Sequence, residues 1–300
     1  MQWQRTLIHT GFLLLLGSGV SYLHYLLRGS EKVQKVGLSL FVLGTVSSAF
    51  AFILRYVEYA TLYPGAMVIG PCETLLLLSF SVSLFTLVGI LATKIRLLPL
   101  VAAPLIGILT VSAAFTLRVE ATPRENLIGS FPIVHILSGI LSYSAFFLLF
   151  TVSVIYLVVE RELKRKHLGP ILERVPSLRD LSRTQSLFLG LGFLFLTLLI
   201  LLGAVQVWKV QQPRVFPDPK ILFALATWLV YGILLGLRLK TRLLGHRMAV
   251  AAIWASLLIV LTFLSELPWN GWHNFLRRRP PREESLSNRD VSNPKGGRNF

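Results

Sequence analysis

Two histidines, His135 and His273, are the residues of this chain whose type and surroundings best suit chemistry. His135 lies within the uncharged run 126–159. A charged side chain at the centre of a bilayer costs about 2.5 to 3.5 kcal/mol on insertion scales, so an ionisable residue on such a segment is a functional candidate. His273 follows the last apolar segment, in the aromatic stretch 268–275. The two imidazoles could ligate one metal centre, or they could be unrelated histidines at a membrane surface.

The choice of metal depends on how many ligands the sequence offers. Imidazole suits zinc, copper and iron, but zinc sites generally need three or four protein ligands, and few acids lie near these histidines. A haem iron needs two axial ligands, and its macrocycle fits an apolar, aromatic groove. Aromatic candidates include Trp208 and Phe216, and Arg55 and Arg124 could contact haem propionates. Because aromatic residues also form belts at membrane surfaces, this set permits haem without requiring it.

Composition indicates whether these residues belong to a water-soluble protein or to a membrane protein. Hydrophobic residues make up 54% of the 300 residues, charged residues 15%, and the mean hydropathy is +0.66, which excludes a water-soluble domain. The single cysteine, Cys72, excludes a disulfide within the chain and a multi-cysteine metal cluster. A helix needs about 20 apolar residues to cross a bilayer, and it satisfies its own backbone hydrogen bonds there. The sequence therefore predicts an all-α, polytopic transmembrane bundle.

Eight apolar segments are long enough to be its spans. The first has no small-residue cleavage site after it, so we expect it to remain as a span. The fifth is longer than a bilayer requires and should tilt or project into the aqueous phase. The predicted spans cover residues 7–27, 36–54, 74–93, 97–117, 131–159, 185–208, 221–238 and 248–268.

Charge predicts the orientation of the bundle. Lys and Arg are concentrated in the loops after the first, third, fifth and seventh spans, which places those loops in the cytoplasm and both termini outside. We therefore expect a multi-pass protein of the cytoplasmic (inner) membrane, with a transmembrane domain over 1–275 and a basic, disordered tail over 276–300. The net charge of +16 is explained by anionic lipid headgroups rather than nucleic acid. The basic loop 161–183 could alternatively dock a cytosolic partner.

Two runs of the sequence carry motifs beyond their hydropathy. The run 215–232 contains Asp218-Pro-Lys220 followed by Thr227-Trp-Leu-Val-Tyr231, and the run 134–145 combines a histidine with a Leu-Ser-Tyr motif. Both resemble segments of the cytochrome c assembly family, which includes the CcsA, CcmC and CcmF proteins. The resemblance extends over about residues 45–275, and its most specific part is the Asp-Pro-Lys segment.

The same resemblance implies roles for the histidines. Arg55 and Glu73 resemble the family's Arg-Trp and Tyr-Glu-Ser pattern between the second and third spans, and His273 occupies the place of its C-terminal histidine. By this resemblance, His135 and His273 would be outer-face axial ligands of a b-type haem, bound without a covalent link and held either stably or in transit. The family handles haem at the extracytoplasmic face, where it is delivered to apocytochrome c or moved between partners.

Departures from the family pattern limit this comparison. Of the tryptophan-rich loop before the Asp-Pro-Lys motif, Trp208 is kept, and Phe216 could replace a stacking ring. A membrane-embedded histidine of the family falls at about Gly236, so no ligand comes from there. Both features are more similar to the HemX and YpjD branch than to a full CcsA synthase. Asp218 would belong to the haem site by resemblance, but it is also well placed as the N-cap of the seventh span, with Pro219 as its first residue.

Three classes of function remain open from the sequence. The preferred one is a haem-binding membrane protein of cytochrome c assembly, with assembly proteins and apocytochrome c as partners. A HemX-like regulator of tetrapyrrole biosynthesis, which contacts a pathway enzyme, is the second. A secondary transporter is the third, although the spans lack central acids. No phosphate-binding loop, zinc-protease motif or catalytic triad is recognisable, so the protein would be at most one subunit of a haem-ligation machinery.

Overall fold

The structure is a computed structural model that describes residues 2–62, 70–93, 95–117, 130–165, 174–210, 219–241 and 245–264. Within these residues every regular element is an α-helix, and each helix contains or overlaps one of the predicted spans, so the all-α fold is confirmed. The helices are α1 (Gln2–Arg28), α2 (Glu31–Leu62), α3 (Pro71–Thr93), α4 (Leu98–Thr116), α5 (Ser130–Lys164), α6 (Leu178–Val210), α7 (Pro219–Thr241) and α8 (His246–Leu264).

Seven of the described helices are long and apolar enough to cross a membrane, which makes the chain a multi-pass membrane protein. By the same measure α8 is a shorter apolar helix, over His246–Thr262. The unusual length predicted for the fifth span is confirmed, because α5 has 35 residues. At about 1.5 Å per residue, α5 is longer than a hydrocarbon layer of about 30 Å. α2 and α6 also exceed that thickness, with 32 and 33 residues.

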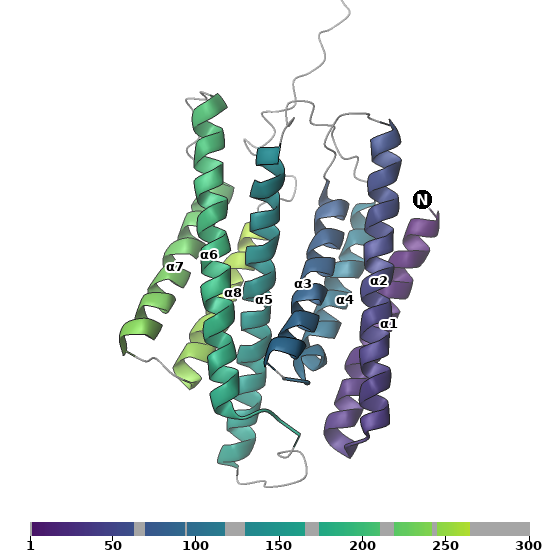
Figure 1. Ribbon diagram of the computed structural model, residues 1–300, viewed down its shortest axis with the longest axis vertical. Coiled ribbons are helices and arrows are strands. Elements are labelled where there is room, and N and C mark those ends of the chain that lie inside the picture. Colours follow the sequence, from purple (N-terminus) through teal and green to yellow (C-terminus); the bar gives the residue numbers. More distant parts are fainter. Residues whose placement is uncertain are drawn as a thin grey trace, which may run out of the picture.

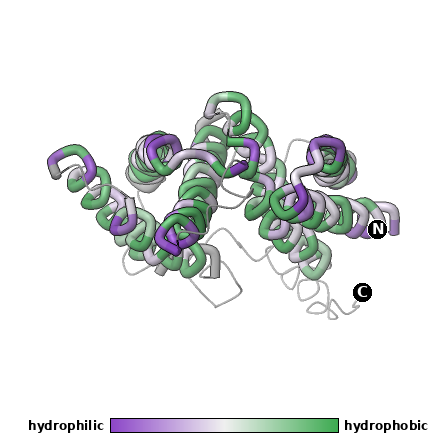
Figure 2. The backbone as a smooth tube through the Cα atoms, turned by 90° about the horizontal axis from the view of Figure 1, so that it is seen from below, coloured by the Kyte–Doolittle hydropathy of each residue, from purple (hydrophilic) through white to green (hydrophobic). Residues whose placement is uncertain are grey.

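The helices form two groups that lie side by side (Figure 1). α1 to α4 pack together in one group and α5 to α8 in the other, and α5 contacts α3 and α4 across the boundary. We call the end of the bundle at which α1 begins the upper end, as drawn in Figure 1, and the opposite end the lower end. Figure 2 views the lower end and shows hydrophilic residues at the helix ends and hydrophobic residues along the helices, as expected for a bundle in an apolar layer.

Small residues bring α1 and α2 together. A Cβ atom added at Gly11 would stand 3.4 Å from the carbonyl oxygen of Gly44, so the two backbones are close at this crossing. Hydroxyl groups connect the same helices, since Ser18 Oγ donates to the Gly37 carbonyl oxygen at 2.8 Å. Close packing of small residues with interhelical hydrogen bonds is a usual way for helices to associate in lipid. This contact fixes the first two helices as a hairpin.

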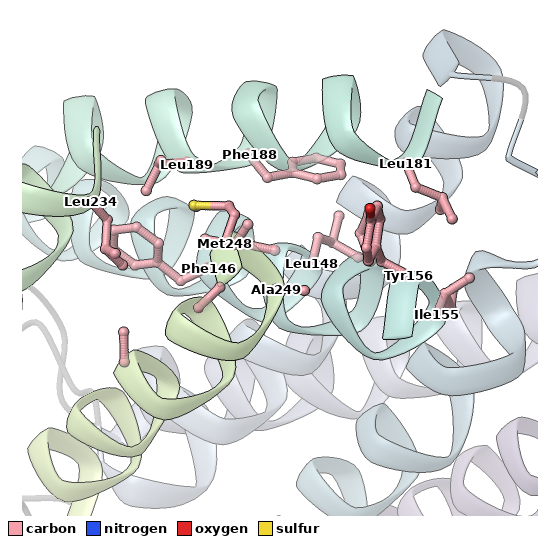
Figure 3. Close-up of a cluster of buried hydrophobic side chains, with 14 of the residues drawn as sticks. Phe146, Leu148, Ile155, Tyr156, Leu181, Phe188, Leu189, Leu234, Met248 and Ala249 are labelled. Carbon is pink, nitrogen blue, oxygen red and sulfur yellow. The ribbon is translucent and has the colours of Figure 1, made fainter. Parts of the chain in front are cut away.

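The second group has a continuous hydrophobic core between α5, α6 and α8 (Figure 3). Phe146 of α5 and Phe188 of α6 are buried there together with Met248 of α8. Ser142 Oγ also donates to the carbonyl oxygen of Gly192 at 2.9 Å, which ties α5 directly to α6. These contacts give α6 a fixed position against α5.

At the lower end, Arg174 connects the two groups of helices. Gly29 follows α1 with a φ angle of +76°, and Arg174, which precedes α6, donates from Nη1 to the Leu26 carbonyl oxygen at 2.9 Å. A positive φ favours glycine, and a guanidinium at a helix C-terminus neutralises unsatisfied carbonyl groups. Arg174 is thereby docked on the end of α1.

Candidate functional site

His135 lies in the second turn of α5, at the upper end of the bundle. Its side chain is half-buried, and its Nδ1 atom is buried. The ring edge faces Gly203 of α6, where an added Cβ atom would stand 3.2 Å from Cε1 and 3.7 Å from Nδ1 of the imidazole. The absence of a side chain at Gly203 therefore provides the space that the imidazole occupies.

The antiparallel packing of α5 and α6 sets this position. One helical turn below His135, an added Cβ atom at Gly139 would meet a methyl group of Leu199 at 3.3 Å. Further down, the Phe146 ring lies so close to Gly192 that an added Cβ atom would be 2.5 Å from it. Large side chains of one helix thus repeatedly fill the space left by small residues of the other. This interlocking leaves little freedom for α5 to slide along α6, so the height of the imidazole is fixed.

Arg55 and Glu73 form a second polar centre at the upper end, within the α1–α4 group. Arg55 Nε donates to Glu73 Oε1 at 2.5 Å, and the two side chains are only 3% and 1% exposed. Arg55 Nη2 also donates to the Tyr59 hydroxyl at 2.7 Å and to the Leu117 carbonyl oxygen at 3.3 Å. Glu73 Oε2 accepts the Gly70 N–H at 2.8 Å. The sequence predicted Arg55 as a partner for a haem propionate, whereas the bonds described for it go to protein atoms.

The Thr-Trp-Leu-Val-Tyr motif of α7 packs against α5 and α6. Trp228 stacks on Phe193 of α6, with ring centroids 5.7 Å apart, and its Nε1 donates to the Thr197 hydroxyl at 3.0 Å. Tyr231 is fully buried and stacks on Phe146 of α5 at 3.8 Å between centroids. The motif therefore fixes α7 to the pair of helices that carries the His135 site.

Several predicted site residues lie outside the residues that the structure describes. These are His273, Phe216, Asp218 and Arg124, and of Trp208 only the backbone, within α6, is described. Of the predicted set, the structure describes the side chains of His135, on α5, and Arg55, on α2. α7 starts at Pro219, and Asp218, the alternative N-cap of this helix, is among the residues outside the described part.

Comparison with known proteins assigns the chain to a family. The family model described as "Cytochrome C assembly protein" matches residues 6–273, which covers most of the chain. The chain belongs to the cytochrome c assembly protein family. It is 32% identical over 129 residues to Protein HemX of Bacillus subtilis (strain 168), an alignment that covers 43% of this chain and 46% of the relative.

The chain is also similar to two further proteins. The cytochrome c biogenesis protein CcsA of Chlamydomonas reinhardtii is 27% identical over 221 residues, or 72% of this chain and 60% of that protein. Protein HemX of Brevibacillus brevis is 30% identical over 135 residues, or 44% and 48%. The chain thus spans roughly half to three fifths of these relatives' lengths. It is a cytochrome c assembly family protein with both CcsA and HemX relatives.

Sequence reasoning missed three residues that shape the upper end in this family member. Gly203 makes room for His135, Tyr59 binds Arg55, and Gly70 donates to Glu73. Each of these residues has a sequence feature that could have indicated its role. A glycine inside an apolar helix often marks a close contact, Tyr59 lies one helical turn after Arg55, and a glutamate in the first turn of a helix can accept a nearby N–H.

Proposed function

We propose that this protein binds haem at the upper end of its helical bundle and holds it there for cytochrome c assembly. The observation that carries the proposal is the half-buried imidazole of His135, which occupies the space left by Gly203 of α6. Membership of the cytochrome c assembly family and the similarity to a CcsA protein support it. Haem supplies an iron with two axial positions, which histidine side chains can fill.

The ring of His135 is suited to the first of these positions. Its Nδ1 atom is buried in the protein. Because Nδ1 is buried, Nε2 is the proposed ligand atom. His273 is the proposed second ligand, and Trp208, Phe216, Asp218 and Arg124 stay proposed neighbours of the macrocycle and its propionates. Contact between Arg55 and a haem propionate stays a prediction.

The proposed site faces the outer side of the cytoplasmic membrane. Basic residues gather at the lower end, where the helix ends and turns carry residues such as Arg28, Arg96, Arg165 and Lys240. The positive-inside tendency would place that end in the cytoplasm and both termini outside. Haem held by His135 would then be presented on the side where apocytochrome c and assembly proteins are the proposed partners.

A haem spectrum of the purified protein tests the proposal. Protein produced in haem-replete cells should show a Soret band that is lost when His135 and His273 are both replaced by Ala. His9→Ala is the matched control, because His9 is an exposed histidine at the same end of the bundle, on α1. A colourless wild-type protein, or an unchanged band in the double variant, would contradict the proposal.

A regulatory function is the second candidate, because two of the relatives are HemX proteins. Such a protein would act through contacts at the lower end, where Arg174, which follows residues 166–173, binds the Leu26 carbonyl oxygen of α1. Replacing residues 166–173 by a Gly-Ser linker should then change the abundance of the first tetrapyrrole-pathway enzyme while the Soret band is kept. Unchanged abundance would argue against regulation through this segment.

A further inference from the structure

The buried ion pair between Arg55 and Glu73 is the least expected feature of the described helices. Taking two charges out of water is costly, and the cost is recovered only when geometry is good and the remaining donors and acceptors are satisfied. Charged residues inside membrane segments are rare and are functional candidates for that reason. The pair lies at 2.5 Å with both side chains almost completely buried. Its surroundings show what it does.

The partners of the pair come from three helices. Arg55 and Tyr59 belong to α2, Glu73 lies in the first turn of α3, and Leu117 is the residue that follows α4. A helix N-terminus favours a negative charge and a helix C-terminus favours a positive one. Glu73 therefore suits the start of α3, and the Arg55 guanidinium suits the end of α4, where it binds the Leu117 carbonyl oxygen at 3.3 Å. Glu73 therefore stabilises the N-terminus of α3 and Arg55 the C-terminus of α4, in addition to neutralising each other.

Two helices, α3 and α4, have one of their ends beside the pair. α2 continues for about two turns beyond Arg55 to Leu62, which is about 10 Å, whereas α3 begins and α4 ends beside the pair. α3 and α4 also pack against α5, where Ile140 belongs to one buried cluster with Leu78 of α3 and Ile106 of α4. The register of α3 and α4 therefore bears on the position of α5, the helix that carries His135.

We infer that Arg55 and Glu73 are a positioning pair, which holds the upper ends of α2, α3 and α4 in one register and so fixes the helices against which α5, with His135, packs. The expected effect on haem binding rests on the proposed haem function, whereas the contacts of the pair with the three helix ends do not depend on it. The pair acts through Leu117 and the start of α3. Loss of the pair should loosen the three helix ends and weaken haem binding together.

Spin-label distances test the geometry without haem. Labels are attached to cysteines at Leu62 and Phe115, which are 63% and 81% exposed, in a Cys72→Ala background. The variants are Arg55→Met, Glu73→Met and the double variant. Each single variant leaves a buried charge without its partner and should lower the melting temperature strongly, whereas the double variant should recover most of it. In the double variant the distance distribution between the labels should nevertheless broaden, and haem affinity should fall about tenfold.

A matched control and a conservative variant complete the test. Glu162→Gln/Arg165→Gln removes an exposed ion pair at the lower end and should leave distances and affinity unchanged. Arg55→Lys keeps the charge but loses the planar fork that reaches Tyr59 and Leu117, so it should broaden the distances as well. Wild-type distances in both the double variant and Arg55→Lys would overturn the positioning role. Broadened distances in a protein that never binds haem would retain the positioning pair and reject the haem function instead.

Discussion

Replacing Gly203 by Ala should weaken haem binding while the fold is kept. The new Cβ atom would stand 3.2 Å from Cε1 of His135. Carbon atoms in good contact are about 3.5 to 4.0 Å apart, so the imidazole must give way by a few tenths of an ångström. Overpacking usually costs about 1 to 3 kcal/mol, and this contact is only slightly short, so we expect about 1 kcal/mol.

This energetic cost should destabilise the haem-bound protein more than the haem-free protein. In haem-free protein the imidazole can turn away from the new methyl group, but coordination of iron requires the ring to stay in place. A penalty of about 1 kcal/mol corresponds to a Kd about fivefold higher. The gain of about 0.5 to 1 kcal/mol that alanine brings to a helix over glycine applies to both states and cancels from the affinity.

Titration of the purified protein with haem, followed at the Soret band, measures this effect. Gly190→Ala is the matched control, because it adds the same methyl group to the same helix at a position where nothing lies within 4 Å. The control should bind haem as the wild type does. Equal affinity in Gly203→Ala, Gly190→Ala and the wild type would refute the reasoning that the Gly203 gap positions the imidazole.

Two predictions concern stability. Gly192→Ala should lower the free energy of unfolding by about 1 to 3 kcal/mol, because its Cβ atom would lie 2.5 Å from the Phe146 ring; a melting temperature at or above that of Gly190→Ala would contradict this. Gly29→Ala should release Arg174 from the end of α1, because it imposes a positive φ on alanine and places Cβ 2.2 Å from Arg174 Nη2. Faster tryptic cleavage after Arg174 would show the release, and a wild-type cleavage rate would count against it.

The helices could be predicted from sequence because crossing a hydrocarbon layer demands long apolar runs. Their ends could not. α2 continues to Leu62 and α6 begins already at Leu178, outside the predicted 36–54 and 185–208. Polar residues there can stay helical in or near water, and hydropathy has no signal for where such a helix stops. At the start of α6, Ser177 caps the helix: its Oγ accepts the Asp180 N–H at 3.1 Å, and its hydroxyl donates to Asp180 Oδ2 at 2.6 Å.

Arg55 shows why the site was harder to predict than the helices. In the sequence it is one of several basic residues near the predicted outer side, and such residues are usually solvated. Its burial depends on Glu73 and Leu117, which belong to other helices. Hydropathy identifies spans but carries no information on which spans are neighbours. The same holds for the match of Gly203 to His135, which only the packing of α6 on α5 shows.

The spin state of ferric haem in the His135→Ala variant tests the central claim most directly. Two histidine ligands give a low-spin, six-coordinate iron, which electron paramagnetic resonance distinguishes from the high-spin iron left by a single ligand. The wild-type protein and His9→Ala should give the low-spin spectrum, and His135→Ala should give the high-spin one. A low-spin, bis-histidine spectrum that persists in His135→Ala would show that this imidazole is not an axial ligand.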